Sequence, residues 1–474
     1  MKNCNSILLF SLAGQAIGSP LLPRKDGVDV KHVAVFSIDG LHNSDIDKWL
    51  ALGPSNISKL LGTGYRYTNA WATFPSDSFP GTLAPYTGAT PRTTGVWYDD
   101  IWDRSFFAPG SGLVYDEGVD VDSTKLFTTI DPAKLPQALI KGQCTNIYPH
   151  MRPRVNTAFE VVVGKGLKTA YTDKHPSYDL VRGPSGKGLS TGYFPEIAST
   201  AGGVDATTAY DQLHVNAWLN WIEGKDIANA EGSLGGKVPT LFGGNFQAVS
   251  VGQKTAGYVK GSLAFTDGLK KAIKFVDDSL GLIIKKLEDK DMLTKTMIVI
   301  APKHGQSPIN PDKFGEVDPK LVTAATGVPV VWQTSDSIAL IFLKDQKDLA
   351  KAVAGLQSQA TALKISDIIY GDRLIKEFGD PSKDPAVPDI VVAPIPGIIY
   401  STSKKKISEH GGLSEEDRHV GVLVSHPKLK KAVFEDKVFT TQVAPTILEA
   451  LDLEAEELVG VKAEGTKALP GFDD

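Results

Sequence analysis

The chain has 474 residues, of which 42% are hydrophobic and 22% are charged. These proportions are typical of a globular protein that buries one large core or two. The net charge of -5 at pH 7 supplies no basic face for a nucleic-acid backbone. The composition therefore argues against a protein that binds a nucleic-acid duplex and leaves a small molecule as the expected partner.

The first residues have the layout of a secretory signal peptide. Lys2 precedes an apolar run over 7–13, and small residues at 16–18 supply a cleavage point. The run is too short to span a bilayer, and no later stretch has the length and apolar character of a membrane anchor. We therefore expect a signal peptide over 1–18, a secreted chain without a membrane anchor, and an N-glycosylation acceptor at Asn56.

A short strand is the first element predicted after this leader. Residues 33–38 are apolar and β-branched, and the run is too short for a helix. The strand ends at Asp39. Chemistry in open α/β sheets takes place at the carboxyl ends of the strands, which makes Asp39 a candidate site residue. The alternative is an ordinary turn or capping aspartate.

Ser78 stands at the start of a predicted helix. Phe79, Pro80 and Gly81 follow it, and proline is tolerated in a first helical turn. A phosphate that met the Ser78 hydroxyl there would also meet free backbone donors. Serine is a favoured N-cap as well, so a capping role is the alternative to a nucleophile. Ser76 is the second candidate nucleophile.

Residues 100–240 are irregular and rich in Gly, Pro, Tyr and Trp. Such loop-rich insertions commonly build substrate pockets, so we expect this segment on the substrate side of the core. Within it, a short strand precedes Asp173 and His175. These two side chains are candidates for a metal or substrate contact, and a structural or surface role is the alternative.

Helix and strand alternate in the second half of the chain. Apolar residues at helical intervals predict a helix over 269–287, which leads into a strand over 297–301. Further strands and one helix follow at 337–343, 347–356, 389–394 and 420–425. This order predicts a doubly wound, mostly parallel α/β sheet with helices on both faces, in a single domain over 26–465.

Polar side chains follow these later elements too. The strand 297–301 leads to Lys303 and His304, and a later loop carries Glu409 and His410. Together with Asp39, these clusters fit one composite site although hundreds of residues separate them. The remaining polar residues near His410 are weaker candidates: Asp417, His419 and His426.

These motifs resemble the alkaline-phosphatase superfamily, specifically its type I phosphodiesterase/nucleotide pyrophosphatase branch, over most of residues 30–465. Asp39 is similar to the first metal-binding aspartate of that branch and Ser78 to the hydroxyl of its Thr/Ser-Phe-Pro-Asn nucleophile motif. His304 is similar to the histidine of its Asp-His-Gly strand end, and His410 to its late metal-binding histidine.

The resemblance implies a secreted, metal-dependent hydrolase of phosphodiester or phosphomonoester bonds, acting through a covalent phosphoryl-serine on a small phosphate or nucleotide ester. A sulfate or phosphonate ester hydrolase on the same core, or a catalytically silent anion-binding relative, is the alternative, because a fold does not decide among these functions.

Three positions depart from the pattern of the branch. Lys303 stands where the branch has an aspartate ligand, and Gly81 replaces its asparagine. The segment similar to its Pro-Asp-x-x-x-His run, from Asn245 to Val249, has neither the acid nor the imidazole. Two zinc ions therefore cannot simply be carried over.

We expect instead one divalent metal ion held by Asp39, Ser78, His304 and His410. Nitrogen ligands beside a carboxylate suit zinc. The Lys303 ammonium would stand in place of a second cation, supplying its charge but not its Lewis acidity. Asn245 stays a possible metal or substrate contact.

Overall fold

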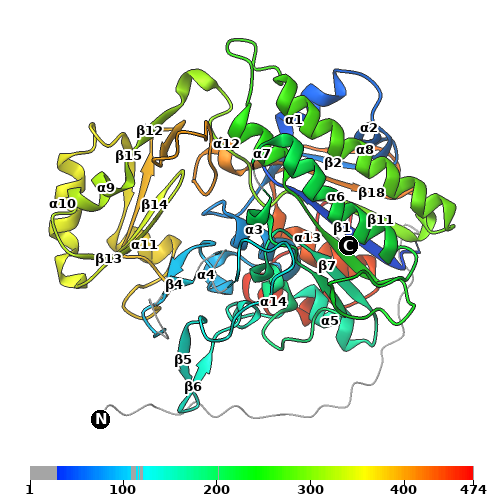
Figure 1. Cartoon of the computed structure of the whole chain (residues 1–474), viewed down its shortest axis with the longest axis horizontal. Helices are drawn as coiled ribbons and strands as arrows, with labels where there is room; N and C mark the ends of the chain where they lie inside the picture. Colours follow the sequence, from blue (N-terminus) through cyan, green and yellow to red (C-terminus); the bar gives the residue numbers. More distant parts are fainter. Residues whose placement is uncertain (1–28, 108–113, 116, 118–120, 201, 473–474) are drawn as a thin grey trace.

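A computed structural model describes residues 29–107, 114–115, 117, 121–200 and 202–472. The predicted signal peptide lies outside the described residues. Figure 1 shows a large central sheet flanked by helices, with a smaller lobe of strands and helices beside it. Within the described ranges, none of the helices combines the length and hydropathy needed to cross a membrane.

The central sheet has ten strands in the order β19-β2-β18-β11-β1-β10-β7-β8-β9, with β20 paired to β2. The strands are β1 (His32–Ile38), β2 (Gly64–Trp71), β7 (Thr169–Thr172), β8 (Thr191–Tyr193), β9 (Glu231–Gly232), β10 (Leu241–Phe246), β11 (Thr296–Ile300), β18 (His419–Ser425), β19 (Ala432–Phe434) and β20 (Val438–Phe439). β1 runs parallel to β10 and β11, and β10 runs parallel to β7. β18 runs antiparallel to β11 and β2.

Helices cover both faces of this sheet, because successive side chains of a strand point to opposite faces. Val33 and Val35 of β1 pack on one core, and Ala34 and Phe36 pack on the other. The first core includes residues of α3 (Ser78–Thr87), α5 (Ala158–Gly164), α13 (Val443–Ala450) and α14 (Val459–Glu464). The second includes residues of α1 (Asn43–Leu50), α2 (Asn56–Gly62), α6 (Val204–Trp221), α7 (Ala248–Thr255) and α8 (Asp267–Asp289). The predicted fold class is confirmed, and so is the long amphipathic helix, which forms as α8.

The smaller lobe contains a separate antiparallel sheet of order β13-β14-β16-β15. Its elements are α9 (Pro319–Ala325), β13 (Val330–Ser335), β14 (Ala339–Leu343), α10 (Leu349–Ser358), β15 (Ile365–Ile369), α11 (Gly371–Glu377) and β16 (Ile390–Pro394), flanked by the pair β12 (Gly315–Val317) and β17 (Ile398–Tyr400). The strands predicted at 337–343 and 389–394 form here as β14 and β16. Adding them to one doubly wound sheet was wrong, because an apolar run predicts a strand but not its partner.

The segment 100–240 is only partly the irregular insertion that the sequence predicts. Two short pairs lie in it, β3 (Ile101–Trp102) with β4 (Val114–Tyr115) and β5 (Gln137–Ile140) with β6 (Gln143–Asn146). β7, β8 and β9 from the same segment complete one edge of the central sheet. Asp173 therefore follows a strand of the core.

The predicted glycan acceptor lies at the start of α2. The Asn56 Nδ2 donates to the backbone oxygen of Asp277 at 2.9 Å and to its carboxylate Oδ2 at 3.1 Å. This side chain thereby ties α2 to α8.

Candidate functional site

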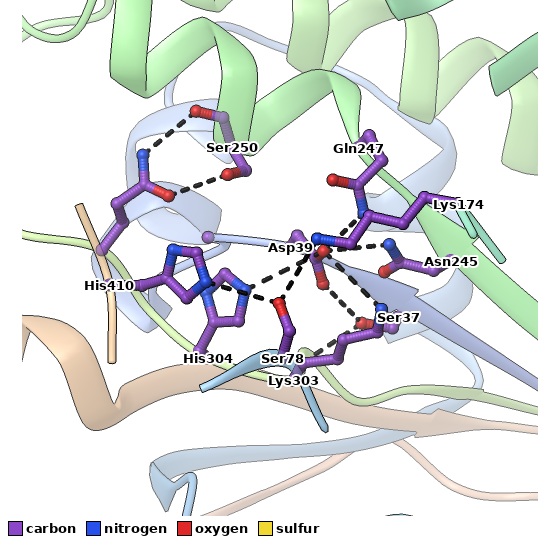
Figure 2. A network of polar contacts seen from close by, with 12 residues as sticks. Ser37, Asp39, Ser78, Lys174, Asn245, Gln247, Ser250, Lys303, His304 and His410 are labelled. Carbon is purple, nitrogen blue, oxygen red and sulfur yellow. Dashed lines mark hydrogen bonds and ion pairs between the residues drawn. The ribbon is translucent and has the colours of Figure 1, made fainter. Parts of the chain in front are cut away.

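Four strands of the central sheet bring polar side chains to one edge. Asp39 follows β1, Asp173 follows β7, Lys303 comes shortly after β11, and Asn245 lies near the end of β10. Since these strands are parallel, their carboxyl ends meet at the same edge of the sheet. Figure 2 shows Asp39 near the centre of the resulting network, and α3 adds Ser78 to it.

Asp39 is a buried anion surrounded by donors of the chain. Its Oδ1 accepts a hydrogen bond from the Ser37 hydroxyl at 3.2 Å. Its Oδ2 accepts from Asn245 Nδ2 at 2.9 Å and from Gln247 Nε2 at 2.5 Å, and lies 3.8 Å from Lys303 Nζ. Burial is the largest single effect and would raise the pKa of Asp39. The charges of Lys303 and Lys174 and the hydrogen bond from Asn245 act together against it, and the pKa lies well below the usual value.

The Lys303 ammonium points into the protein. Its side chain is 1% exposed, and Nζ lies 3.0 Å and 2.9 Å from the two carboxylate oxygens of Asp173. The Tyr178 ring centroid is 4.0 Å from the same nitrogen, and the Tyr171 hydroxyl donates to Asp173 at 2.7 Å. Asp173, predicted as a metal or substrate contact, is thus the counter-ion of Lys303.

Ser78 is the first residue of α3, and Asp77 occupies the N-cap position that the sequence suggested for Ser78. The Ser78 hydroxyl is fully buried. Its Oγ lies 3.4 Å from Lys174 Nζ and 3.4 Å from His410 Nε2. The candidate nucleophile therefore stands between a cation and an imidazole.

Lys174 is a site residue that the sequence analysis missed. Its Nζ forms an ion pair of 2.7 Å with Glu117 Oε1 as well as the contact with Ser78. Burial opposes the charge, but Glu117 and Asp39 raise the pKa of Lys174 above its usual value. No motif or residue spacing in the sequence distinguishes Lys174 from an ordinary loop lysine.

His304 and His410 lie face to face. Their ring centroids are 3.8 Å apart and their planes differ by 10°. His304 Nδ1 contacts the Gly305 carbonyl at 2.7 Å, while Nε2 has no hydrogen-bond partner and lies 3.9 Å from Asp39 Oδ2. The lone pair of an imidazole nitrogen lies in the ring plane, so two parallel stacked rings cannot both point at one ion.

This stacking does not fit the single metal site predicted from Asp39, Ser78, His304 and His410. Among the described residues, no group of three or more His, Cys, Asp or Glu side chains is arranged to hold a metal ion. Asn245, the further possible ligand, uses its amide nitrogen to donate to Asp39. The predicted ligands are close together but do not surround one point.

Both histidines are neutral at pH 7. Burial, with the nearby charge of Lys254, lowers the pKa of His410 to about 4 despite the opposing effect of Glu409. Burial also lowers the pKa of His304, with His410 adding to the shift. His410 Nδ1 lies 3.0 Å from Glu409 Oε2, and Nε2 lies 3.4 Å from both Ser78 Oγ and Asp77 Oδ1.

His175 belongs to a charged network beside the site. Its Nδ1 lies 2.7 Å from Glu196 Oε1 and its Nε2 3.4 Å from Glu117 Oε2. Against the effect of burial, these carboxylates raise the pKa of His175 to about 9. Both ring nitrogens are engaged, so His175 is not arranged as a metal ligand.

The remaining predicted candidates have structural contacts. The Ser76 hydroxyl donates to the Asp417 backbone oxygen at 2.6 Å. His419 and His426 contact backbone oxygens of other segments, and the Asp417 carboxylate accepts from Ser414 at 2.6 Å. None of these contacts involves Ser78.

Two departures from the motifs have a packing explanation. A Cβ at Gly81 would lie 2.2 Å from the Lys303 carbonyl oxygen, so the asparagine expected there does not fit. Val249 is buried in the core of the sheet. Gln247, at the N-cap of α7, donates to Asp39, and the sequence analysis did not identify this residue.

Comparisons with known proteins identify the family of the chain. The family model for type I phosphodiesterase/nucleotide pyrophosphatase matches residues 33–419. Ectonucleotide pyrophosphatase/phosphodiesterase family member 3 of Rattus norvegicus is 24% identical over 289 residues, which cover 61% of this chain and 26% of that protein. The match thus spans about a quarter of the length of that relative.

The fold is shared with solved structures of murine ectonucleotide pyrophosphatase/phosphodiesterase 5. The TM-score is 0.59 at 14% sequence identity, covering 90% of this chain and 96% of the murine chain. One of these structures is an inactive variant in complex with AMP.

Proposed function

Because the chain belongs to the type I phosphodiesterase/nucleotide pyrophosphatase family, we propose that it hydrolyses phosphoric esters at Ser78. The observation that supports this most is the position of the Ser78 hydroxyl, 3.4 Å from both Lys174 Nζ and His410 Nε2. The proposed substrate is a small phosphate or nucleotide ester, which the AMP bound to the murine protein supports. The predicted signal peptide supports action outside the cell.

In the proposed first step, Ser78 Oγ attacks phosphorus. The Oγ–P bond forms as the bond from phosphorus to the leaving oxygen breaks, and His410 Nε2 takes the serine proton. The Lys174 ammonium offsets the negative charge that develops on the phosphoryl oxygens. Water then attacks phosphorus and the Oγ–P bond breaks. His410 returns its proton to Ser78 Oγ, and the proton released by the water goes to the oxygen that left in the first step.

The single zinc ion expected from the sequence has no part in these steps, because the donors do not fit it. The two Asp39 oxygens already accept hydrogen bonds from three side chains. Lys303 Nζ lies 3.8 Å from Oδ2. A divalent ion bound to that carboxylate would lie close to the Lys303 ammonium, whose positive charge would repel it.

The test is turnover of the purified protein on an aryl phosphodiester, an aryl phosphomonoester and an aryl sulfate. We expect hydrolysis of a phosphate ester, and a loss of more than about 10³-fold in Ser78→Ala with unchanged circular dichroism. Full activity in a folded Ser78→Ala protein would place the nucleophile elsewhere. Cleavage of the sulfate alone would favour the alternative hydrolase, and no cleavage of any ester would favour the silent relative.

A further inference from the structure

We infer that two buried lysines, Lys174 and Lys303, supply the positive charge of this site in place of divalent metal ions. The inference rests on the proposed function, because it concerns the charge at the same site. The resemblance of the sequence to its family implies a dependence on divalent metal ions. The chain departs from its family in the chemistry of its cations.

The two ammonium groups lie around a common ring. Lys303 Nζ is 4.0 Å and Lys174 Nζ 5.6 Å from the ring centroid of Tyr178. Lys303 approaches Asp39, and Lys174 approaches Ser78. Figure 2 shows both lysines directed toward the network that joins Asp39 and Ser78. A phosphoryl group held at Ser78 would therefore meet Lys174 first, with Lys303 behind it.

Each lysine has a carboxylate that fixes its position. Asp173 holds Lys303 at 2.9 Å, and Glu117 holds Lys174 at 2.7 Å. The carboxylates are anchored in turn, since the Tyr171 hydroxyl donates to Asp173 and the Tyr178 hydroxyl donates to Glu117. Ammonium groups fixed in this way need no reorganisation when an anion binds, which is the condition for effective electrostatic stabilisation.

The same residues oppose a metal ion. The amide nitrogens of Asn245 and Gln247 donate to Asp39 Oδ2, so an ion that used this oxygen would have to displace both hydrogen bonds. His304 and His410 are stacked, so their lone pairs do not converge. Lys303 places a positive charge 3.8 Å from the same oxygen of Asp39.

The test uses the full chain after dialysis against EDTA, with residual metal measured by inductively coupled plasma mass spectrometry. Binding of bis(p-nitrophenyl) phosphate to the metal-free Ser78→Ala protein is measured by calorimetry and compared with binding of p-nitrophenyl phosphate. Turnover of both esters by the metal-free wild type is measured with and without added Zn²⁺. Lys174→Met removes the ammonium group that contacts Ser78, and Lys174→Arg keeps its charge. Lys187→Met, at an exposed lysine, is the matched control.

We expect the metal-free protein to bind the diester, and Zn²⁺ to change turnover less than twofold. Lys174→Met should weaken diester binding at least tenfold, Lys174→Arg should restore part of it, and Lys187→Met should change nothing. Binding and turnover that appear only when Zn²⁺ is restored would overturn the inference and leave the proposed function standing. Lysine-dependent diester binding without turnover of any ester, with or without metal, would support the lysine site and contradict the proposed function.

Discussion

The Ser78 hydroxyl differs from that of an ordinary serine at a helix start through its neighbours. Lys174 and His410 reach it from positions 96 and 332 residues along the chain. The motif around Ser78 and the glycine-flanked His410 could be recognised in the sequence. Lys174 and Gln247 could not, because neither residue type nor spacing distinguishes them from solvent-exposed loop residues.

His175 gives a pH-dependent stability that can be measured. Its pKa of about 9 in the folded protein exceeds the usual value of about 6.5 in an unfolded chain. Protonated His175 therefore stabilises the folded state. This stabilisation is complete at a pH below the pKa of the unfolded chain, and it is lost as the pH rises through the pKa of the folded protein. The difference corresponds to a contribution on the order of 3 kcal/mol.

We therefore expect His175→Gln to lower the free energy of unfolding most at pH 6 and progressively less up to pH 9.5. Urea denaturation at a series of pH values measures this difference. A difference between wild type and variant that does not change over this range would contradict the assigned charge of His175.

At the scale of elements, the start of α3 is pressed against the segment that follows β11. Gly81 is the contact, since a Cβ there would lie 2.2 Å from the Lys303 carbonyl oxygen. This close approach keeps Ser78 and Lys303 in the same network. The strands and the helix that follow a regular pattern, β1, β11 and α8, could be predicted from the sequence, because each pattern lies within one element.

Gly81→Ala should destabilise the protein by more than about 2 kcal/mol, because backbone atoms must move to admit the methyl group. Gly164→Ala is the control, since a Cβ at the end of α5 meets nothing within 4 Å. The control should be neutral or slightly stabilising, as expected for alanine in place of glycine in a helix. Urea denaturation of both variants measures the effect, and equal stabilities would show that α3 does not approach Lys303 as closely as described.

At the scale of the whole molecule, the site lies where the central sheet and the smaller lobe meet. The backbone nitrogen of Ser337, just before β14, donates to the His410 carbonyl oxygen at 3.1 Å. The Gly411 backbone nitrogen donates to the Ser76 carbonyl oxygen at 2.9 Å. The lobe thereby positions the loop that carries His410. Its separate sheet was not predicted, because strand pairing depends on contacts between distant segments that no local pattern contains.

The same limit explains why the predicted arrangement of metal ligands differs from the structure. Strand ends and motifs predicted that Asp39, Ser78, His304 and His410 lie near one another, and the structure places His304 near Asp39 and His410 near Ser78. It could not give the relative orientation of the two imidazole rings, which stack at 3.8 Å. Ligand geometry depends on side-chain orientation, which is set by packing across the whole site.

The most direct measurement of the central claim is the identification of the residue that bonds to phosphorus. Wild-type protein is mixed with bis(p-nitrophenyl) phosphate, quenched in acid within the first turnover, digested and analysed by peptide mass spectrometry, with Ser78→Ala treated in parallel. The account predicts a phosphoryl ester on the peptide that contains Ser78 and none in the variant. An adduct on any other residue, or full turnover by Ser78→Ala, would contradict it.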